Sequence, residues 1–336
     1  MGEKVRMGVV GVGDFGRNHV RVYGSLEEVE LVGVFDSNAE RAREVAAAFQ
    51  TRAFESLDAL AEVVEAASVA VPTREHARVG RALLEQGIDV LVEKPIAGSL
   101  AEADELIRAA EQNRRILQAG HTERFNPAVR AAAGIVTRPL FFEVHRMGVF
   151  SGRSLDVDVV FDLMIHDLDI VLSLVAAPVE QVHAAGIPVL SSKVDIASVR
   201  LEFADGCIAN LTASRASTEK VRKLRFFQPH EYVSVDYERR DCLVISLDQE
   251  AAAAAARGVP PSLPAGLQFR KLEVEQEEPL HAELRAFAQA VRSRQPAPAS
   301  GTEGRQALAL AEQVAAGIAA HGRKVQAALA SAGAST

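Results

Sequence analysis

Length, composition and charge exclude several classes of protein. The chain has 336 residues, 48% of them hydrophobic and 24% charged, so it can bury a core in each of two domains. Its formal net charge of −8 argues against a basic surface that would bind nucleic acid. Cys207 and Cys242 are too few for a disulfide framework or a zinc site. These features indicate a globular protein of a reducing compartment.

The beginning of the chain predicts its location. Met1-Gly2-Glu3-Lys4 leads directly into a strand-like run, without the apolar segment of a signal peptide. No stretch of about 18 uncharged apolar residues occurs in the sequence. We therefore expect a cytoplasmic protein that does not enter a membrane.

The chain up to His121 alternates short β-branched runs with longer helical stretches rich in alanine, glutamate and arginine. Such alternation is typical of βαβ units, and short apolar runs are typical of strands buried on both faces of a parallel sheet. Residues 1–121 are therefore predicted to form a doubly wound α/β domain. The predicted strands are Arg6–Val10, Leu31–Phe35, Ser68–Val71, Asp89–Val92 and Ile116–Gln118.

Residues 122–336 follow a different pattern, in which strand-like runs succeed one another with few helices between them. Ala204-Asp205-Gly206 supplies a hairpin turn between two of these runs. The pattern predicts an α+β domain built on an open, mostly antiparallel sheet. Its predicted strands are Leu140–Met147, Val182–Gly186, Ala197–Phe203, Cys207–Ala213 and Tyr232–Tyr237.

The helices of this second region are fewer. One is predicted over Thr122–Ala133 and another over Val159–Val175. Residues 249–267 read as an excursion or loop, because six alanines are followed by glycine and prolines. Two amphipathic helices, His281–Arg292 and Gly304–Ala320, end the chain, and the last of them can pack back on the first domain.

A glycine-rich string follows the first predicted strand and precedes a helix. Gly11, Gly13 and Gly16, with Asp14 and Phe15 between them, have the spacing of a dinucleotide-binding turn. The first glycine would allow the turn, the second the approach of a pyrophosphate, and the third close packing of helix on strand. The alternative is a tight strand-to-helix turn that binds nothing.

Asp36 supports the dinucleotide interpretation. It ends the second predicted strand, 20 positions after Gly16, where an acidic side chain hydrogen-bonds the ribose of the cofactor. A carboxylate there repels a 2′-phosphate, which favours NAD over NADP, although Arg41 lies close enough in sequence to pair with a phosphate. The remaining predicted cofactor contacts follow later strands or Asp36 itself: Ser37, Pro72, Thr73, His76, Glu93 and Lys94.

Lys94 is the first predicted catalytic residue. It stands in Glu93-Lys94-Pro95, directly after the fourth predicted strand, and ligands of open α/β sheets bind at the carboxyl ends of strands. A lysine in that position can donate a hydrogen bond to a substrate oxygen. The competing interpretation is an ordinary surface lysine.

Three polar residues share one face of the predicted helix 159–175. Asp162, His166 and Asp169 are spaced i, i+4 and i+7, on a face expected to be apolar. A histidine there can take the proton of a hydroxyl, and a nearby aspartate can stabilise its imidazolium form. The alternative is a histidine satisfied by a structural hydrogen bond beside a salt-bridged aspartate. No cluster has metal-ligand spacing, and we predict no metal.

The order of these motifs resembles the glucose-fructose oxidoreductase and inositol dehydrogenase (Gfo/Idh/MocA) family: GVGDFG, then Asp36, then EKP at 93–95, then DLMIHDLD at 162–169. The resemblance covers essentially the whole chain. It implies that Lys94, Asp162 and His166 line the active site. By this resemblance His166 would be the base, Lys94 would hold the reacting oxygen, and Asp162 would support both.

A further string, GHTERFNP at 120–127, is similar to a segment of the subgroup that acts on UDP-linked N-acetylated amino sugars, such as UDP-N-acetylglucosamine 3-dehydrogenase. That resemblance makes Arg124 and Asn126 candidate substrate contacts, with Arg146 and Arg153 as weaker candidates. An arginine after the fifth strand can equally pair with a diphosphate or cap the sheet.

The predicted function is an NAD-dependent dehydrogenase that oxidises a sugar hydroxyl to a ketone, at C3 of a UDP-N-acetylated amino sugar. An inositol or aldose dehydrogenase of the same family is the alternative substrate class, and a non-catalytic NAD-binding sensor is an alternative of another kind. The resemblance also implies a homo-oligomer, a dimer or a tetramer, because an open sheet presents edges and a face that need covering.

Overall fold

The computed structural model describes residues 3–150, 157–257 and 266–333. The chain forms two compact units: Met1–Phe125 with Glu277–Ala309, and Asn126–Gln276 with Leu310–Thr336. The sequence predicted one domain over residues 1–121 and another over 122–336, and these limits remain a prediction. The compact units divide the chain at other residues.

The first unit contains a sheet of six parallel strands in the order β3-β2-β1-β4-β5-β6. This order reverses at β1, and the crevice at such a reversal is where open α/β sheets bind ligands. The doubly wound sheet predicted from the sequence is therefore confirmed. The strands are β1 Val5–Val10, β2 Val29–Phe35, β3 Arg52–Ala53, β4 Ala66–Val69, β5 Asp89–Glu93 and β6 Leu117–Gly120.

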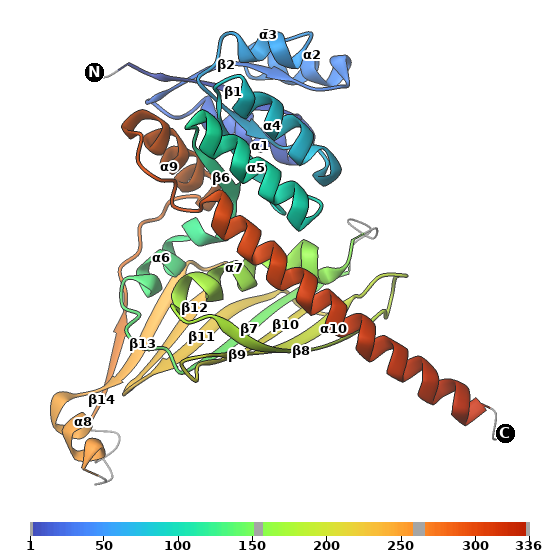
Figure 1. Cartoon of the computed structure of the whole chain (residues 1–336). Helices are drawn as coiled ribbons and strands as arrows, with labels where there is room; N and C mark the ends of the chain where they lie inside the picture. The colour runs from blue at the N-terminus through green and yellow to red at the C-terminus, as the bar shows by residue number, and fades with distance from the viewer. Residues whose placement is uncertain (1–2, 151–156, 258–265, 334–336) are drawn as a thin grey trace. The chain divides into compact units, whose positions relative to one another are not determined.

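Helices flank this sheet, with α4 and α5 side by side in Figure 1. Three of the helices are capped at their N-terminus by a side chain that accepts a backbone hydrogen bond. Asn38 accepts from the N–H of Arg41, Ser56 from the N–H of Ala59, and Ser99 from the N–H of Glu102. The elements are α1 Asp14–Tyr23, α2 Ala39–Ala48, α3 Leu57–Ala61, η1 Thr73–Glu75, α4 His76–Glu85, α5 Leu100–Asn113, η2 Thr122–Phe125 and α9 Pro279–Ser293.

The core of the first unit joins segments that are distant in the sequence. Met7 of β1, Tyr23 of α1 and Phe287 of α9 are all fully buried in one cluster. Residues near the C-terminus therefore complete the hydrophobic core that begins at the N-terminus.

The second unit contains an eight-stranded sheet in the order β14-β13-β12-β11-β7-β10-β9-β8. All neighbouring pairs are antiparallel except β7 and β10, which are parallel. The mostly antiparallel sheet is confirmed. Its strands are β7 Phe141–Val149, β8 Val179–Ile187, β9 Ile196–Phe203, β10 Ile208–Ser217, β11 Val221–Gln228, β12 Glu231–Asp236, β13 Asp241–Leu247 and β14 Leu267–Lys271.

The hairpin predicted at Ala204-Asp205-Gly206 is present between β9 and β10. The Phe203 N–H donates to the Cys207 carbonyl at 2.9 Å, and Gly206 has φ +87°. Strands β3, β11, β13 and β14 were not among the predicted runs. In β11 the buried residues alternate with charged ones, Leu224 and Phe226 against Arg225, which is the period of a strand with one buried face.

Helices α6 Pro127–Ala133 and α7 Ile165–Leu174 lie on one face of this sheet (Figure 1). The single helix predicted over Thr122–Ala133 is wrong, because it is divided at Asn126. Pro127 disfavours helical backbone at the residue before it, and Asn126 instead caps α6 by accepting the Ala128 N–H at 3.1 Å. The predicted helix 159–175 is also not uniform: a π-helical turn, η3 Val160–Met164, precedes α7.

Part of the stretch 249–267, which the sequence predicted as an excursion or loop, is helical. Its alanines form helix α8, Gln249–Ala256, as expected from the high helix propensity of alanine. The last helix is α10, Gly301–Gly333. Among the described residues, no helix has the length and apolar character needed to traverse a membrane.

Candidate active site

The glycine-rich turn between β1 and α1 has the geometry expected of a dinucleotide site. Gly11 has φ +84°, and a Cβ there would lie 2.7 Å from the Ala70 carbonyl oxygen. A Cβ on Gly16 would lie 1.8 Å from the Gly11 oxygen, so helix α1 could not approach the turn with any other residue. At Gly13 a Cβ would meet nothing within 4 Å, which leaves the turn open at the start of α1.

Asp36 is attached to this turn. Its carboxylate is buried and accepts the backbone N–H of Val12 and of Asn38, each at 2.8 Å. Arg41 approaches it, with Nη1 3.6 Å from Oδ2. The acidic side chain thus joins the end of β2 to the glycine turn and keeps a negative charge beside it.

A pocket of about 530 Å³ lies along the carboxyl ends of β1, β2 and β4. Its walls combine the open turn, the carboxylate of Asp36, the helix N-terminus and apolar side chains, a set that fits a dinucleotide. Arg74, Glu75 and Arg78 line it but were not predicted. Of the predicted cofactor contacts the pocket contains Gly11, Gly13, Asp14, Phe15, Asp36, Ser37, Arg41 and Pro72, whereas Gly16, Thr73, His76, Glu93 and Lys94 do not line it.

Glu93, at the end of β5, holds the segment that carries Lys94. Its Oε1 lies 2.9 Å from His19 Nε2, and its Oε2 accepts the Lys94 N–H at 3.2 Å. Burial raises the pKa of Glu93, but the hydrogen bond and charge of His19, together with the charge and backbone N–H of Lys94, outweigh burial and lower the pKa. Glu93 is therefore a carboxylate that organises the backbone at Lys94, whose side chain is half-buried.

His76 also acts inside the fold rather than in the pocket. It is buried, with Nδ1 2.8 Å from the Pro95 carbonyl oxygen and Nε2 2.9 Å from that of Val71. Burial lowers its pKa. Its ring joins the loop after β4 to the loop after β5.

In the second unit, the π-helical turn η3 carries Asp162, and α7 carries His166 and Asp169. Asp162 and His166 are half-buried, whereas Asp169 is fully buried. π-helical turns inside α-helices occur frequently at functional sites. Such a turn directly before a half-buried histidine fits a catalytic position for His166.

A buried ion pair fixes the first turn of α7 to the sheet. Arg146 of β7 donates from Nε and Nη2 to the two carboxylate oxygens of Asp167, at 2.7 and 2.9 Å, and both side chains are 3% exposed. Tyr237 donates to the same carboxylate at 3.2 Å, and its ring lies 5.0 Å from the Arg146 guanidinium. Asp167 adjoins His166 in sequence, so this cluster holds the helical turn that carries the histidine.

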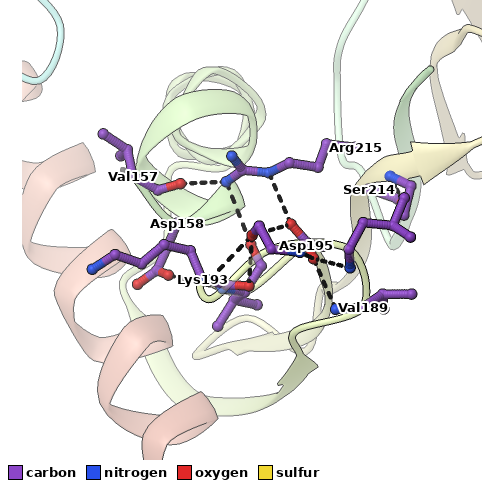
Figure 2. A network of polar contacts seen from close by, with 11 residues as sticks. Val157, Asp158, Val189, Lys193, Asp195, Ser214 and Arg215 are labelled. Carbon is purple, nitrogen blue, oxygen red and sulfur yellow. Dashed lines mark hydrogen bonds and ion pairs between the residues drawn. The ribbon is translucent and has the colours of Figure 1, made fainter. Parts of the chain in front are cut away.

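A second network holds the beginning of the same helical segment, as Figure 2 shows. Fully buried Asp195 accepts the N–H groups of Val189, Leu190 and Ser191 at 2.6–2.8 Å and lies 3.5 Å from Arg215. Arg215 also donates to the Val157 carbonyl, and the Val159 N–H donates to Val194 at 3.0 Å. The loop between β8 and β9 is thereby fastened to the residues that precede η3.

The predicted substrate residues occupy different surroundings. Arg124 donates to Glu303 and, at 3.2 Å, to the Pro298 carbonyl, which favours the capping alternative. Asn126 caps α6 and donates to the Tyr237 carbonyl at 3.0 Å, and Arg146 is in the ion pair described above. Arg153 lies outside the described residues. Contact of these residues with substrate remains a prediction.

Two family models match the sequence. Residues 5–121 match an oxidoreductase family with an NAD-binding Rossmann fold, and residues 135–228 match the GFO/IDH/MocA C-terminal domain. The chain belongs to the GFO/IDH/MocA oxidoreductase family. The resemblance predicted from the motifs is confirmed, and the protein is an NAD-dependent oxidoreductase.

Individual relatives agree with this family assignment. The UDP-N-acetylglucosamine 3-dehydrogenase of Acidithiobacillus ferrooxidans is 38% identical over 92% of this chain and 96% of its own. Its solved structure superposes with a TM-score of 0.86 at 35% identity, covering 95% of this chain and 99% of that one. A levoglucosan dehydrogenase solved with NADH and levoglucosan has a TM-score of 0.81 at 17% identity, over 95% and 98% of the two chains, which shows the shared fold.

In this GFO/IDH/MocA member, sequence reasoning missed three groups that organise the candidate site: His19, Asp167 and Asp195. His19 had a detectable signal, because it lies on the buried face of α1 with Val20 and Tyr23. Asp167 and Asp195 had no such signal in the sequence, because their partners Arg146 and Arg215 lie on separate strands, β7 and β10.

Among the described residues, no group of three or more histidine, cysteine, aspartate or glutamate side chains is arranged to hold a metal.

Proposed function

We propose that this oxidoreductase converts a secondary hydroxyl of a UDP-linked N-acetylated amino sugar to a ketone, with C3 of UDP-N-acetylglucosamine as the first candidate. The observation that carries the proposal is the similarity to the A. ferrooxidans 3-dehydrogenase, which extends over nearly the whole of both chains. The GHTERFNP string at 120–127 supports the same substrate class.

His166 is the proposed base. Its imidazole takes the hydroxyl proton, and the carboxylate of Asp162, one turn earlier, stabilises the imidazolium form. Lys94 donates a hydrogen bond to the reacting oxygen as it changes from hydroxyl to carbonyl. NAD, when bound, accepts the hydride that leaves the carbinol carbon.

The residues of the first unit fit the cofactor. The open turn at Gly13 and the N-terminus of α1 present backbone N–H groups to a pyrophosphate. Buried Asp36 hydrogen-bonds the adenosine ribose and disfavours a 2′-phosphate.

NADH formation tests the proposal, with UDP-N-acetylglucosamine, myo-inositol and free aldoses offered separately. We expect turnover with the UDP-sugar, and a loss on the order of 100- to 10,000-fold in His166→Ala with NAD binding retained. Turnover with free polyols alone would withdraw the nucleotide-sugar assignment and leave the family.

Inositol is the second candidate substrate. An inositol 2-dehydrogenase of Rubrobacter xylanophilus is 29% identical over 64% of this chain, a shorter and weaker match than that of the nucleotide-sugar enzyme. A sensor that binds NAD without turnover is a third reading, and measurable turnover with any of these substrates excludes it. Arg124, Asn126, Arg146 and Arg153 stay proposed substrate contacts, and for Arg146 the unfolding measurement in the Discussion separates this role from a structural one.

A further inference from the structure

Two buried histidines hold the residues on either side of Lys94. On one side, His19 Nε2 lies 2.9 Å from the carboxylate of Glu93. On the other, His76 Nδ1 lies 2.8 Å from the carbonyl oxygen of Pro95. Both imidazoles are 1% exposed. The lysine therefore sits in a three-residue segment whose two ends are each bound by an imidazole.

The His19 side of this arrangement is closely packed. His19 belongs to α1, which Gly16 brings into contact with the glycine turn. Its ring packs edge-on against Tyr23, with centroids 6.5 Å apart, and Tyr23 is hydrogen-bonded to Ser68 of β4 at 2.7 Å. The backbone of Glu93 also packs closely against the neighbouring strand, because a Cβ on Gly120 would lie 2.9 Å from the Glu93 Cα. Close packing of this kind limits the positions open to a buried side chain.

The His76 side links two loops. His76 is the first residue of α4, and its second nitrogen lies 2.9 Å from the Val71 carbonyl oxygen, after β4. A neutral imidazole donates one of these two hydrogen bonds, and a protonated imidazole donates both. The hydrogen bond that holds the backbone at Pro95 is made by a proton on Nδ1, in the neutral or the protonated ring.

Both histidines project from helices that also line the cofactor pocket. Asp14 and Phe15 of α1, and Arg78 and Val79 of α4, are in its walls. The same two helices thus shape the pocket and hold the backbone beside Lys94. A lysine side chain rotates about the bonds of four methylene groups, so its ammonium group is placed accurately only when its backbone is held.

We propose that His19 and His76 are positioning residues, which hold the Glu93-Lys94-Pro95 backbone so that the Lys94 ammonium group is fixed relative to the dinucleotide pocket. The inference rests on the proposed role of Lys94 in the reaction. Neither histidine contacts the substrate in this scheme. Both act through the segment that carries the lysine.

Hydrogen–deuterium exchange tests the hold on the segment without any substrate. In His19→Leu, which removes the ring nitrogens, we expect the backbone N–H groups of residues 93–97, among which Pro95 has none, to exchange about tenfold faster than in the wild type. His19→Gln is the matched control, because its amide nitrogen can reach Glu93 from nearly the same position. Amides of β1, in the same sheet, should be unaffected in both variants. Unchanged exchange of residues 93–97 in His19→Leu, or equal acceleration throughout the sheet, would overturn the proposal.

His76 offers a second matched pair of variants that both keep a polar side chain. The amide nitrogen of His76→Asn matches Nδ1 and can retain the bond to Pro95, whereas that of His76→Gln matches Nε2 and can retain only the bond to Val71. We expect His76→Asn to keep residues 93–97 protected and His76→Gln to lose about tenfold in protection. The reverse order would contradict the proposed hold on Pro95.

Turnover then tests the positioning role, on whichever sugar the wild type oxidises. His19→Leu and His76→Gln should lower kcat on the order of 10- to 100-fold, with the KM for NAD within about threefold of the wild type. Faster exchange at residues 93–97 with unchanged kcat would refute the positioning role. A wild type inactive on every sugar would instead defeat the proposed function, and the exchange results would then decide alone whether the histidines hold the segment.

Discussion

Replacing Arg146 by methionine should cost far more stability than an ordinary surface substitution. The change keeps most of the side-chain length but removes the cation that faces Asp167, and both partners are 3% exposed. Asp167 would retain only the Tyr237 hydroxyl, at 3.2 Å, among the three hydrogen bonds described for it. Breaking a buried ion pair from one side costs roughly 3–5 kcal/mol, mostly because the remaining charge is left without compensation.

That free energy translates into a readily measured shift. With a urea dependence of about 2 kcal/mol per molar, a loss of about 4 kcal/mol moves the unfolding midpoint by about 2 M. The chain has no tryptophan, so far-UV circular dichroism is the suitable signal. The double variant Arg146→Met with Asp167→Asn should recover about 2 kcal/mol of the loss, because it also removes the unpaired buried charge.

The same experiment separates a structural Arg146 from a substrate-binding one. If the guanidinium contacts substrate instead of Asp167, Arg146→Met leaves the urea midpoint near the wild-type value and raises the KM for the UDP-sugar. That result, together with no recovery in the double variant, would refute the structural reasoning.

Three further predictions follow from the described contacts. Burial raises the pKa of Asp195, but the Ser191 hydroxyl and three backbone N–H groups outweigh burial and lower the pKa to about 2. The ionised carboxylate therefore stabilises the fold at pH values above the ordinary pKa of 3.8, and this contribution is lost as the pH falls toward 2. The stability difference between wild type and Asp195→Asn, measured by urea unfolding, should therefore shrink over that interval. Asp36→Ala should lower kcat/KM for NAD about tenfold or more and weaken the preference over NADP, because it removes the carboxylate that we propose to bind the ribose and to repel a 2′-phosphate. We expect a second copy of the chain to cover Phe227, which is 36% exposed between Phe141 and Tyr232 on the sheet; light scattering should show an oligomer for wild type and a smaller species for Phe227→Glu.

The predicted elements agree with the structure where local pattern decides the outcome. Five buried strands of the first sheet and the glycine turn were found because hydrophobic runs and turn residues act over a few neighbouring positions. The errors arise where such cues compete. Pro127 divides a helix that its neighbours would otherwise continue, and the alanines of α8 form a helix despite the prolines that follow them.

For the candidate site, the sequence by itself predicted Gly11, Asp36, Lys94 and His166, since each belongs to a short motif tied to one end of a strand or one face of a helix. The sequence did not predict the supporting roles of the residues that hold these groups in place, because a histidine, arginine or aspartate has the same local pattern whether it binds a ligand or another side chain.

Only the tertiary structure decided those supporting roles. Arg146 and Asp167 are 21 positions apart, and His19 and Glu93 are 74 apart, yet each pair makes hydrogen bonds shorter than 3 Å. Such pairs form after strands and helices from distant segments have packed, when burial makes an uncompensated charge costly. Local sequence determines which side chains are available for chemistry, and packing determines which of them are left to do it.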